Sequence, residues 1–213
     1  MIGRPGRRGA RATGAAAATR HGSGVARRQF AALFLLMLVG TASGASLDRI
    51  SVEAWRDGDA VIVEARALLR ADLETAWGVL TDYDRYAEFI PDLKSSRILA
   101  RSGSSVVVEQ KGQAGFFLFH FPMEVTLSVT EAPRSGITSR AIAGTFREMT
   151  GSYTLTRDGD DLRFAYYGRL VPDFVLPPLI GTAAVKAAVQ KQFVALVAQM
   201  QARAAAQPKP PAR

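Results

Sequence analysis

An alternation of apolar and polar side chains dominates the middle of the chain. Between residues 117 and 129 every second residue is apolar, and the opposite phase includes His120, Glu124, Thr126 and Ser128. A period of two turns one face of a strand towards a core and the other towards water. The pattern is strict here and weaker on either side, and it predicts an antiparallel sheet. The predicted strands cover residues 106–111, 117–129, 137–148, 151–156 and 162–171.

Two extended stretches and a helix precede this region. The stretches lie within residues 47–69 and flank the turn 56–59, whose Asp-Gly pair is a strong hairpin signal. In the second stretch apolar residues alternate with Glu64 and Arg66, which predicts a half-buried strand. Helical spacing of apolar residues then predicts a helix capped by Asp72. The stripe of that helix consists of Leu73, Ala76, Trp77 and Leu80.

Prolines divide the remaining elements. A short helix over residues 83–89 must end before Pro91, because proline disfavours helix in the residue before it. Three prolines within residues 172–181 predict an irregular loop. A long amphipathic helix follows, and residues 204–213 are predicted to be a disordered tail. The apolar stripe of the long helix consists of Val185, Val189, Phe193, Leu196, Val197 and Met200.

This order of elements predicts an α+β domain over residues 46–203. The long C-terminal helix must bury its apolar stripe, and the apolar face of the sheet is the available partner. We therefore expect a curved antiparallel sheet wrapped around that helix, with two short helices after the first strand region.

The positive charge of the chain is concentrated at its start. Residues 1–45 hold seven of the 27 basic residues and none of the 19 acidic ones, so residues 46–213 carry a net charge of about +1. The predicted domain has no basic stripe, and we expect no nucleic-acid partner.

Residues 1–45 are typical of an export leader. Low-complexity sequence is followed by Arg27 and Arg28, an apolar run over residues 30–39 and small residues up to Ala45. These are the three parts of a secretory signal, with cleavage expected after Gly44 or Ala45 and a periplasmic or secreted product. An uncleaved membrane anchor is the alternative. Twin-arginine export and a translation start at Val25 also stay open.

Few residues offer chemistry. The chain has no cysteine, and His120 is the one histidine after the leader, so we expect no metal site, no cofactor and no histidine-based triad. Arg147 shares the alternation phase of Ile137 and Ala141. Its guanidinium could hold a ligand carbonyl or carboxylate if that phase faces a cavity. A salt bridge at the strand end is the alternative.

Three segments carry a resemblance to a known family. They are residues 79–99 (VLTDYDRYAEFIPDLKSSRIL), 144–155 (GTFREMTGSYTL) and 174–181 (FVLPPLIG). Together they resemble the START-like, helix-grip superfamily, and within it the polyketide cyclase/dehydrase and coenzyme Q-binding group. The resemblance covers residues 50–203. It implies a cavity for an apolar ligand between the sheet and the C-terminal helix.

The resemblance also implies where ligand contacts would lie, although plain core packing is the alternative for most of these residues. The expected rim of the cavity consists of Tyr83, Phe89, Ile90, Pro91, Phe174, Leu176 and Pro177. The expected interior consists of Phe117, Phe119, Met123, Tyr153, Tyr166 and Phe193, with Arg147 as a polar candidate.

The leading functional hypothesis is an exported binding module for an apolar or lipidic molecule such as a quinone or isoprenoid. Transient contact with a membrane surface and the oligomeric state stay open. The alternative is a cyclase or dehydratase acting on a polyketide-like substrate in the same cavity. A third alternative, ribosome association, conflicts with export. Fold alone does not decide among them.

Overall fold

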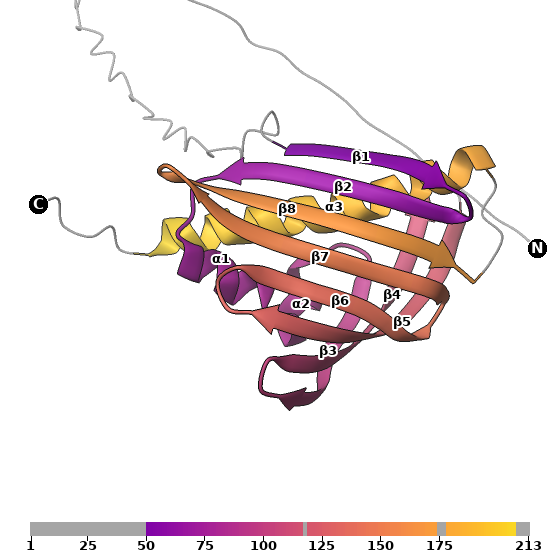
Figure 1. The fold of residues 1–213 in the computed structure, drawn as a ribbon, viewed down its shortest axis with the longest axis horizontal. Helices are drawn as coiled ribbons and strands as arrows, with labels where there is room; N and C mark the ends of the chain where they lie inside the picture. Colours follow the sequence, from indigo (N-terminus) through magenta and orange to yellow (C-terminus); the bar gives the residue numbers. More distant parts are fainter. Residues whose placement is uncertain (1–49, 117–118, 174–177, 208–213) are drawn as a thin grey trace, which may run out of the picture. The chain divides into compact units, whose positions relative to one another are not determined.

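The strands of the protein form one antiparallel sheet. A computed structural model describes residues 50–116, 119–173 and 178–207. Figure 1 shows the sheet, whose strand order is β1-β2-β8-β7-β6-β5-β4-β3. The strands are β1 (Ile50–Asp57), β2 (Ala60–Leu69), β3 (Leu93–Ser102), β4 (Ser105–Phe116), β5 (Phe119–Ala132), β6 (Gly136–Gly144), β7 (Phe146–Asp158) and β8 (Asp161–Pro172).

The predicted N-terminal hairpin is present. β1 and β2 pair from Ile50–Ala67 to Asp57–Ala60, and Gly58 takes a φ of 63° in the turn. That backbone conformation suits glycine, which has no Cβ to clash. The predicted inward face of β2 is buried, and its residues are Val61, Val63, Ala65 and Ala67.

Two short helical segments follow β2, as predicted. Helix α1 (Leu73–Leu80) begins after Asp72, whose side chain accepts a hydrogen bond from the Thr75 amide at 2.8 Å. A 3-10 turn, η2 (Tyr83–Arg85), leads into α2 (Tyr86–Phe89), which ends two residues before Pro91. Trp77, predicted to lie in the core, is half-buried and packs against it.

The predicted strand over residues 137–148 is in fact nearly all of β6 and the start of β7. Gly144 has a φ of 119°, and the Thr145 amide turns back to donate to the Glu124 carbonyl at 2.8 Å. β6 pairs with β5 up to Gly144, whereas β7 pairs with β8 from Phe146 onwards. The change of partner at Thr145 breaks the alternation that the prediction extended through this segment.

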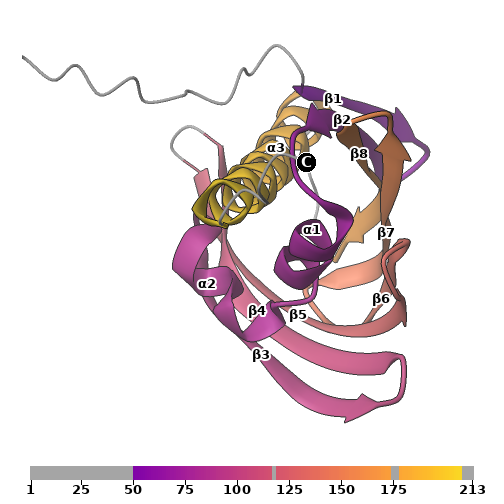
Figure 2. The same cartoon turned by 90° about the vertical axis from the view of Figure 1, so that its left-hand side faces the viewer.

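The sheet curves around helix α3 (Pro178–Ala206), as Figure 2 shows in the view along the helix. Pro178 stands at the first position of α3, where its missing amide hydrogen is not needed. The helix therefore includes part of the predicted loop 172–181, and residues 174–177 lie outside the described residues. At its other end α3 reaches Ala206, past the predicted boundary at residue 203.

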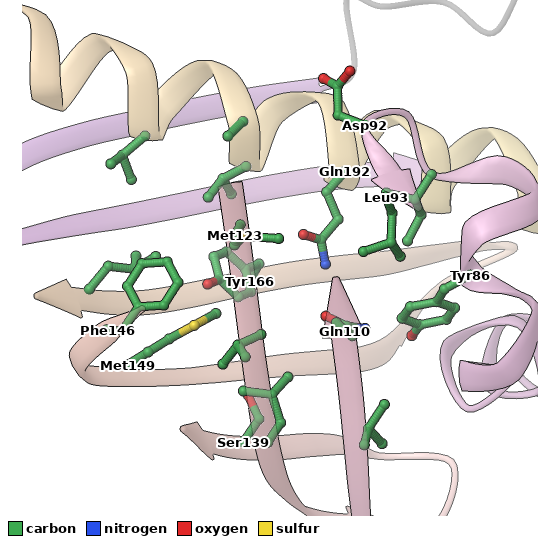
Figure 3. Close-up of a pocket in the computed structure, with 18 of the residues that line it drawn as sticks. Tyr86, Asp92, Leu93, Gln110, Met123, Ser139, Phe146, Met149, Tyr166 and Gln192 are labelled. Carbon is green, nitrogen blue, oxygen red and sulfur yellow. The ribbon is translucent and has the colours of Figure 1, made fainter. Parts of the chain in front are cut away.

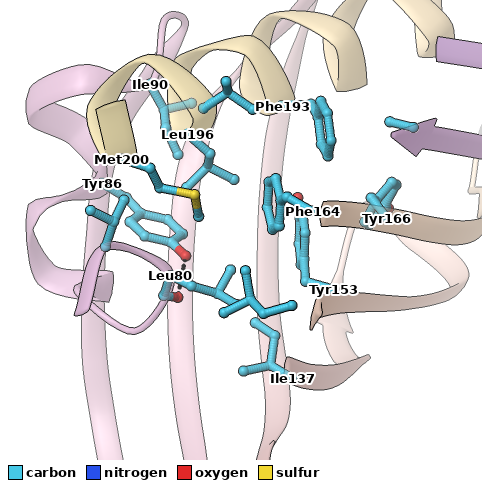
Figure 4. Packing of buried hydrophobic residues seen from close by; sticks show 14 of the residues in the cluster. Leu80, Tyr86, Ile90, Ile137, Tyr153, Phe164, Tyr166, Phe193, Leu196 and Met200 are labelled. Carbon is cyan, nitrogen blue, oxygen red and sulfur yellow. Dashed lines mark hydrogen bonds between the residues drawn. The ribbon is translucent and has the colours of Figure 1, made fainter. Parts of the chain in front are cut away.

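The core lies between the concave face of the sheet and the C-terminal half of α3. Phe193, Leu196 and Met200 are fully buried against Phe164 and the end of α1 at Leu80 (Figure 4). The long helix thus buries its stripe against the sheet, which confirms the predicted helix-grip arrangement.

Candidate functional site

A cavity of about 150 Å³ lies between the concave face of the sheet and α3. Figure 3 shows side chains converging on it from several strands, from α3 and from the segment around Tyr86. Most of its wall is aliphatic or aromatic. The aliphatic residues contributed by the sheet are Val108, Val125, Leu127, Val129, Ile137 and Leu170, and those contributed by α3 are Ala184, Val185, Ala188 and Val189.

The structure brings six of the sequence-predicted ligand contacts to this cavity. They are Tyr83, Ile90, Pro91, Met123, Tyr153 and Tyr166. Their position in the lining does not test whether they bind a ligand, so that role stays a prediction.

Other predicted contacts lie elsewhere. Phe193 is fully buried and stacks on Phe164, with ring centroids 4.8 Å apart, so it belongs to the core. Phe89 packs beside Tyr86 against the core and is not part of the cavity lining. The side chain of Phe119 lies outside the described part, as do the whole residues Phe117, Phe174, Leu176 and Pro177.

Arg147 is not brought to the cavity. Its side chain is 55% exposed and its Nη2 lies 2.6 Å from Oδ2 of Asp59 in the β1–β2 turn. The expected shared phase with Ile137 does not hold, because Arg147 follows the strand break at Thr145. The arginine takes the alternative position, in a salt bridge near a strand end. Phe146 and Met149 line this part of the cavity instead.

Tyr153 and Tyr166 line the cavity and belong to an aromatic row on the sheet that also includes Phe164 (Figure 4). Tyr153 stacks on Phe164 at 5.4 Å, and Tyr166 lies 4.6 Å from Tyr153 between ring centroids. The ring of Tyr166 lies over two glycines. A Cβ atom on Gly168 would stand 2.6 Å from Tyr166 Cζ, and one on Gly151 would stand 3.2 Å from Cε2. The glycines make room for a flat tyrosine on the sheet.

The polar groups that face the cavity are mostly uncharged. Gln192 Nε2 of α3 donates to Tyr153 Oη at 3.2 Å, and Tyr86 Oη donates to the Leu80 carbonyl at 2.6 Å. Gln110 Nε2 donates to Ser96 Oγ at 3.4 Å. Burial raises the pKa of Tyr86, Tyr153 and Tyr166 far above the usual value, because the phenolate would be poorly solvated. These phenols stay protonated at any physiological pH.

The lining reaches the surface at Asp92, beside Pro91 and Leu93. Lys191 Nζ of α3 lies 2.8 Å from Asp92 Oδ2, and both side chains are about half exposed. Asp92 has a φ of 67°, and its carbonyl accepts from the Gln113 amide at 2.9 Å. This ion pair therefore spans the mouth of the cavity, from the segment after α2 to α3.

Metal-binding clusters and membrane-spanning helices are both absent from the described part of the chain. It contains no group of three or more histidines, cysteines or carboxylates that could hold a metal ion. None of the described helices is both long and apolar enough to cross a membrane.

A family model for polyketide cyclase/dehydrase and lipid transport matches residues 69–201, more than half of the chain. The chain belongs to this family. The matched residues run from the end of β2 through the cavity to the last turns of α3.

Solved structures share the fold. A STAR-related lipid transfer protein from Xanthomonas axonopodis superposes with a TM-score of 0.58 at 17% identity, over 72% of this chain and 94% of that one. The Zhui aromatase/cyclase from Streptomyces superposes with a TM-score of 0.57 at 19% identity, over 68% of this chain and 94% of that one. A START superfamily protein from Mycobacterium smegmatis has a TM-score of 0.54 at 16% identity, over 68% of this chain and 97% of that one. No curated protein matches the chain.

Among family members, both lipid transfer and cyclase chemistry are represented, so the site of this chain must be interpreted from its own residues. Sequence reasoning missed its main polar residue, Gln192. The signal was present, because Gln192 lies three residues after Val189 and four before Leu196, on the buried stripe of the helix. Gln110, the other amide of the lining, lies within the predicted strand 106–111.

Proposed function

We propose that this protein is a binding module for an apolar, uncharged small molecule held between the sheet and α3. The observation that carries the proposal is the cavity itself, which has an apolar wall, a few uncharged polar groups and one ion pair at its mouth. Ligand sites of small molecules generally have this composition.

The size of the cavity limits what it encloses. About 150 Å³ is less than the roughly 300–1,000 Å³ of sites for drug-sized ligands. An apolar cavity of this order accommodates a single ring. Burying about 150 Å² of apolar ligand surface contributes about 4 kcal/mol. A longer lipid would place its ring or chain end inside and continue outwards past Asp92.

Binding has more support than catalysis. A cyclase or dehydratase requires a group that exchanges a proton near neutral pH. In the described lining the titratable side chains are Asp92 and four tyrosines. Asp92 is exposed and paired with Lys191, and the pKa of each of the four tyrosines is raised by burial. Neither arrangement provides an evident base.

We propose that the ligand is a quinone or an isoprenoid. We also propose that the protein is exported and works in the periplasm or outside the cell. The proposed ligand follows from an apolar wall that also holds hydrogen-bonding groups. The proposed export follows from Arg27, Arg28, the apolar run 30–39 and the small residues up to Ala45. Fractionation of cells expressing the full chain tests export. Protein that stays in the cytoplasm at full length would contradict it.

Native mass spectrometry of the full chain, expressed in a cell that makes quinones, tests binding. A stoichiometric apolar molecule should be released by organic extraction and identified. Val125→Trp and Val185→Phe fill the cavity from β5 and α3 and should lower its occupancy. Thr130→Trp, on the outer face of β5, is the matched control. Unchanged occupancy in folded filling variants would contradict the proposed site.

A further inference from the structure

The hydroxyl of Tyr166 has no hydrogen-bond partner among the described residues, although the residue is only 7% exposed. It lies over Gly168 on the concave face of the sheet. Figure 3 shows that Tyr166 and Gln192 both line the cavity, Tyr166 from the sheet and Gln192 from α3. A hydroxyl of a residue that lines an apolar cavity is poorly solvated when it has no partner, so an acceptor supplied by a ligand would stabilise it.

Two more groups beside Tyr166 have hydrogen-bonding capacity left. Tyr153 Oη accepts from Gln192 Nε2, which leaves its own hydrogen to donate. The amide of Gln192 retains a second N–H and its carbonyl oxygen. The ring centroids of Tyr153 and Tyr166 are 4.6 Å apart, so the three residues, called the polar cluster below, lie on neighbouring parts of an otherwise apolar wall.

The polar cluster contains no charge. The cation nearest to Gln192 along the chain is Lys191, and it pairs with Asp92 at the mouth of the cavity. A carboxylate or phosphate inside the cavity would have to give up its hydration without a counter-ion, which costs far more than a phenol hydrogen bond returns. A carbonyl, ether or hydroxyl oxygen loses much less on burial.

We infer that Tyr166, Tyr153 and Gln192 determine specificity by binding one acceptor oxygen of a neutral, apolar ligand, such as a ketone or quinone carbonyl. The inference rests on the proposed function and narrows it. Hydrocarbons enter the cavity but leave Tyr166 unpartnered, and anions are excluded from it.

Three single-ring probes of similar shape test this: acetophenone, ethylbenzene and benzoate, titrated at pH 7 into the full chain stripped of bound lipid. One net hydrogen bond predicts that the ketone binds about tenfold more tightly than the hydrocarbon. The carboxylate should bind at least about tenfold more weakly than the ketone.

Tyr166→Phe and Gln192→Leu should each lower the ketone-to-hydrocarbon ratio by about three- to tenfold, with hydrocarbon affinity unchanged or higher. Tyr167→Phe is the matched control, because Tyr167 is 46% exposed on the other face of β8 and should leave the ratio unchanged.

Two outcomes overturn the inference while leaving the proposed function intact. One is that the hydrocarbon binds and that neither Tyr166→Phe nor Gln192→Leu changes the ratio of ketone affinity to hydrocarbon affinity. The other is carboxylate binding as tight as that of the ketone. If none of the probes binds the wild-type protein and no molecule is extracted from it, the proposed function fails together with the inference.

Discussion

The ring of Tyr166 occupies the space directly over Gly168, so that a Cβ atom on Gly168 would stand 2.6 Å from Cζ of the ring. Both residues lie on the concave face of β8, two positions apart. The absence of a side chain at one position therefore sets the orientation of the tyrosine at the other, and with it this part of the cavity wall.

Gly168→Ala should push the Tyr166 ring into the cavity. We expect a loss of about 1–3 kcal/mol in the free energy of unfolding and a clear loss of affinity for acetophenone. Urea unfolding and fluorescence titration measure the two effects. Gly78→Ala is the control, because an added Cβ there meets no atom within 4 Å, and alanine favours helix by about 1 kcal/mol. Equal behaviour of the two variants would contradict this account.

Asp72→Ala should destabilise the domain by about 0.5–2 kcal/mol at pH 7 through loss of the α1 cap. The hydrogen bond from the Thr75 hydroxyl is the main cause that lowers the pKa of Asp72 below 3.8. A carboxylate whose pKa is lowered by folding stabilises the fold above pH 3.8. This contribution is lost as the pH falls through the pKa of the folded state.

The difference in unfolding free energy between wild type and Asp72→Ala should therefore shrink in acid, as measured by urea unfolding at several pH values. Asp72→Asn keeps a capping side chain without the charge, and its stability should vary less with pH in this range. A wild-type advantage that grows on acidification would refute the assignment.

Lys191→Met should speed ligand release with little change in stability. The pair with Asp92 is about half exposed, and such pairs contribute about 0–1 kcal/mol. Stopped-flow displacement of bound acetophenone should show that the variant releases it about two- to fivefold faster than the wild type. High salt should raise the wild-type release rate to that of the variant, because it screens the pair. Lys186 lies on the same helix as Lys191. The control variant Lys186→Met removes its pair with Glu53 of β1 and is expected to leave the release rate unchanged.

Alkaline pH should unfold the domain because four of its five tyrosines are held in protonated form. Burial raises the pKa of Tyr83, Tyr86, Tyr153 and Tyr166, and the unfolded chain loses these protons near pH 10. The stabilisation is complete below pH 10 and falls above it, since the unfolded state then binds fewer protons.

Phenolate absorbance and circular dichroism, recorded in one alkaline titration, measure this coupling. We expect most of the absorbance change to coincide with unfolding. Full ionisation of these tyrosines in a protein that retains its native spectrum would show that they are accessible in the folded state.

Sequence patterning predicted the fold well where one periodicity extended over a whole element. The inward face of β2, the Asp72 cap and the stripe of α3 follow from local rules and appear in the structure. The break at Thr145 was missed because it depends on a change of strand partner. The sequence GTFREM contains no proline or Asp-Gly pair to mark it.

The candidate site was harder to predict than the fold. Aromatic residues on an inward face can either complete the core or line a cavity, and periodicity does not distinguish the two. Phe193 proved to be core, whereas Tyr153 and Tyr166 line the cavity. Phe193 of α3 is covered by Phe164, whereas Tyr166 lies over Gly151 and Gly168 on the sheet. Neither contact is visible before the strand register and the position of the helix are known.

Helix α3 comes last along the chain among the described elements of the domain, yet it packs on β1, β2 and β4 and supplies one wall of the cavity. Until Pro178 and the residues after it leave the ribosome, the sheet has nothing to close around, and Phe164 and Tyr153 lack their cover. The domain therefore cannot be completed before α3 has been synthesised. Until then, the unfinished sheet is the species that chaperones would encounter.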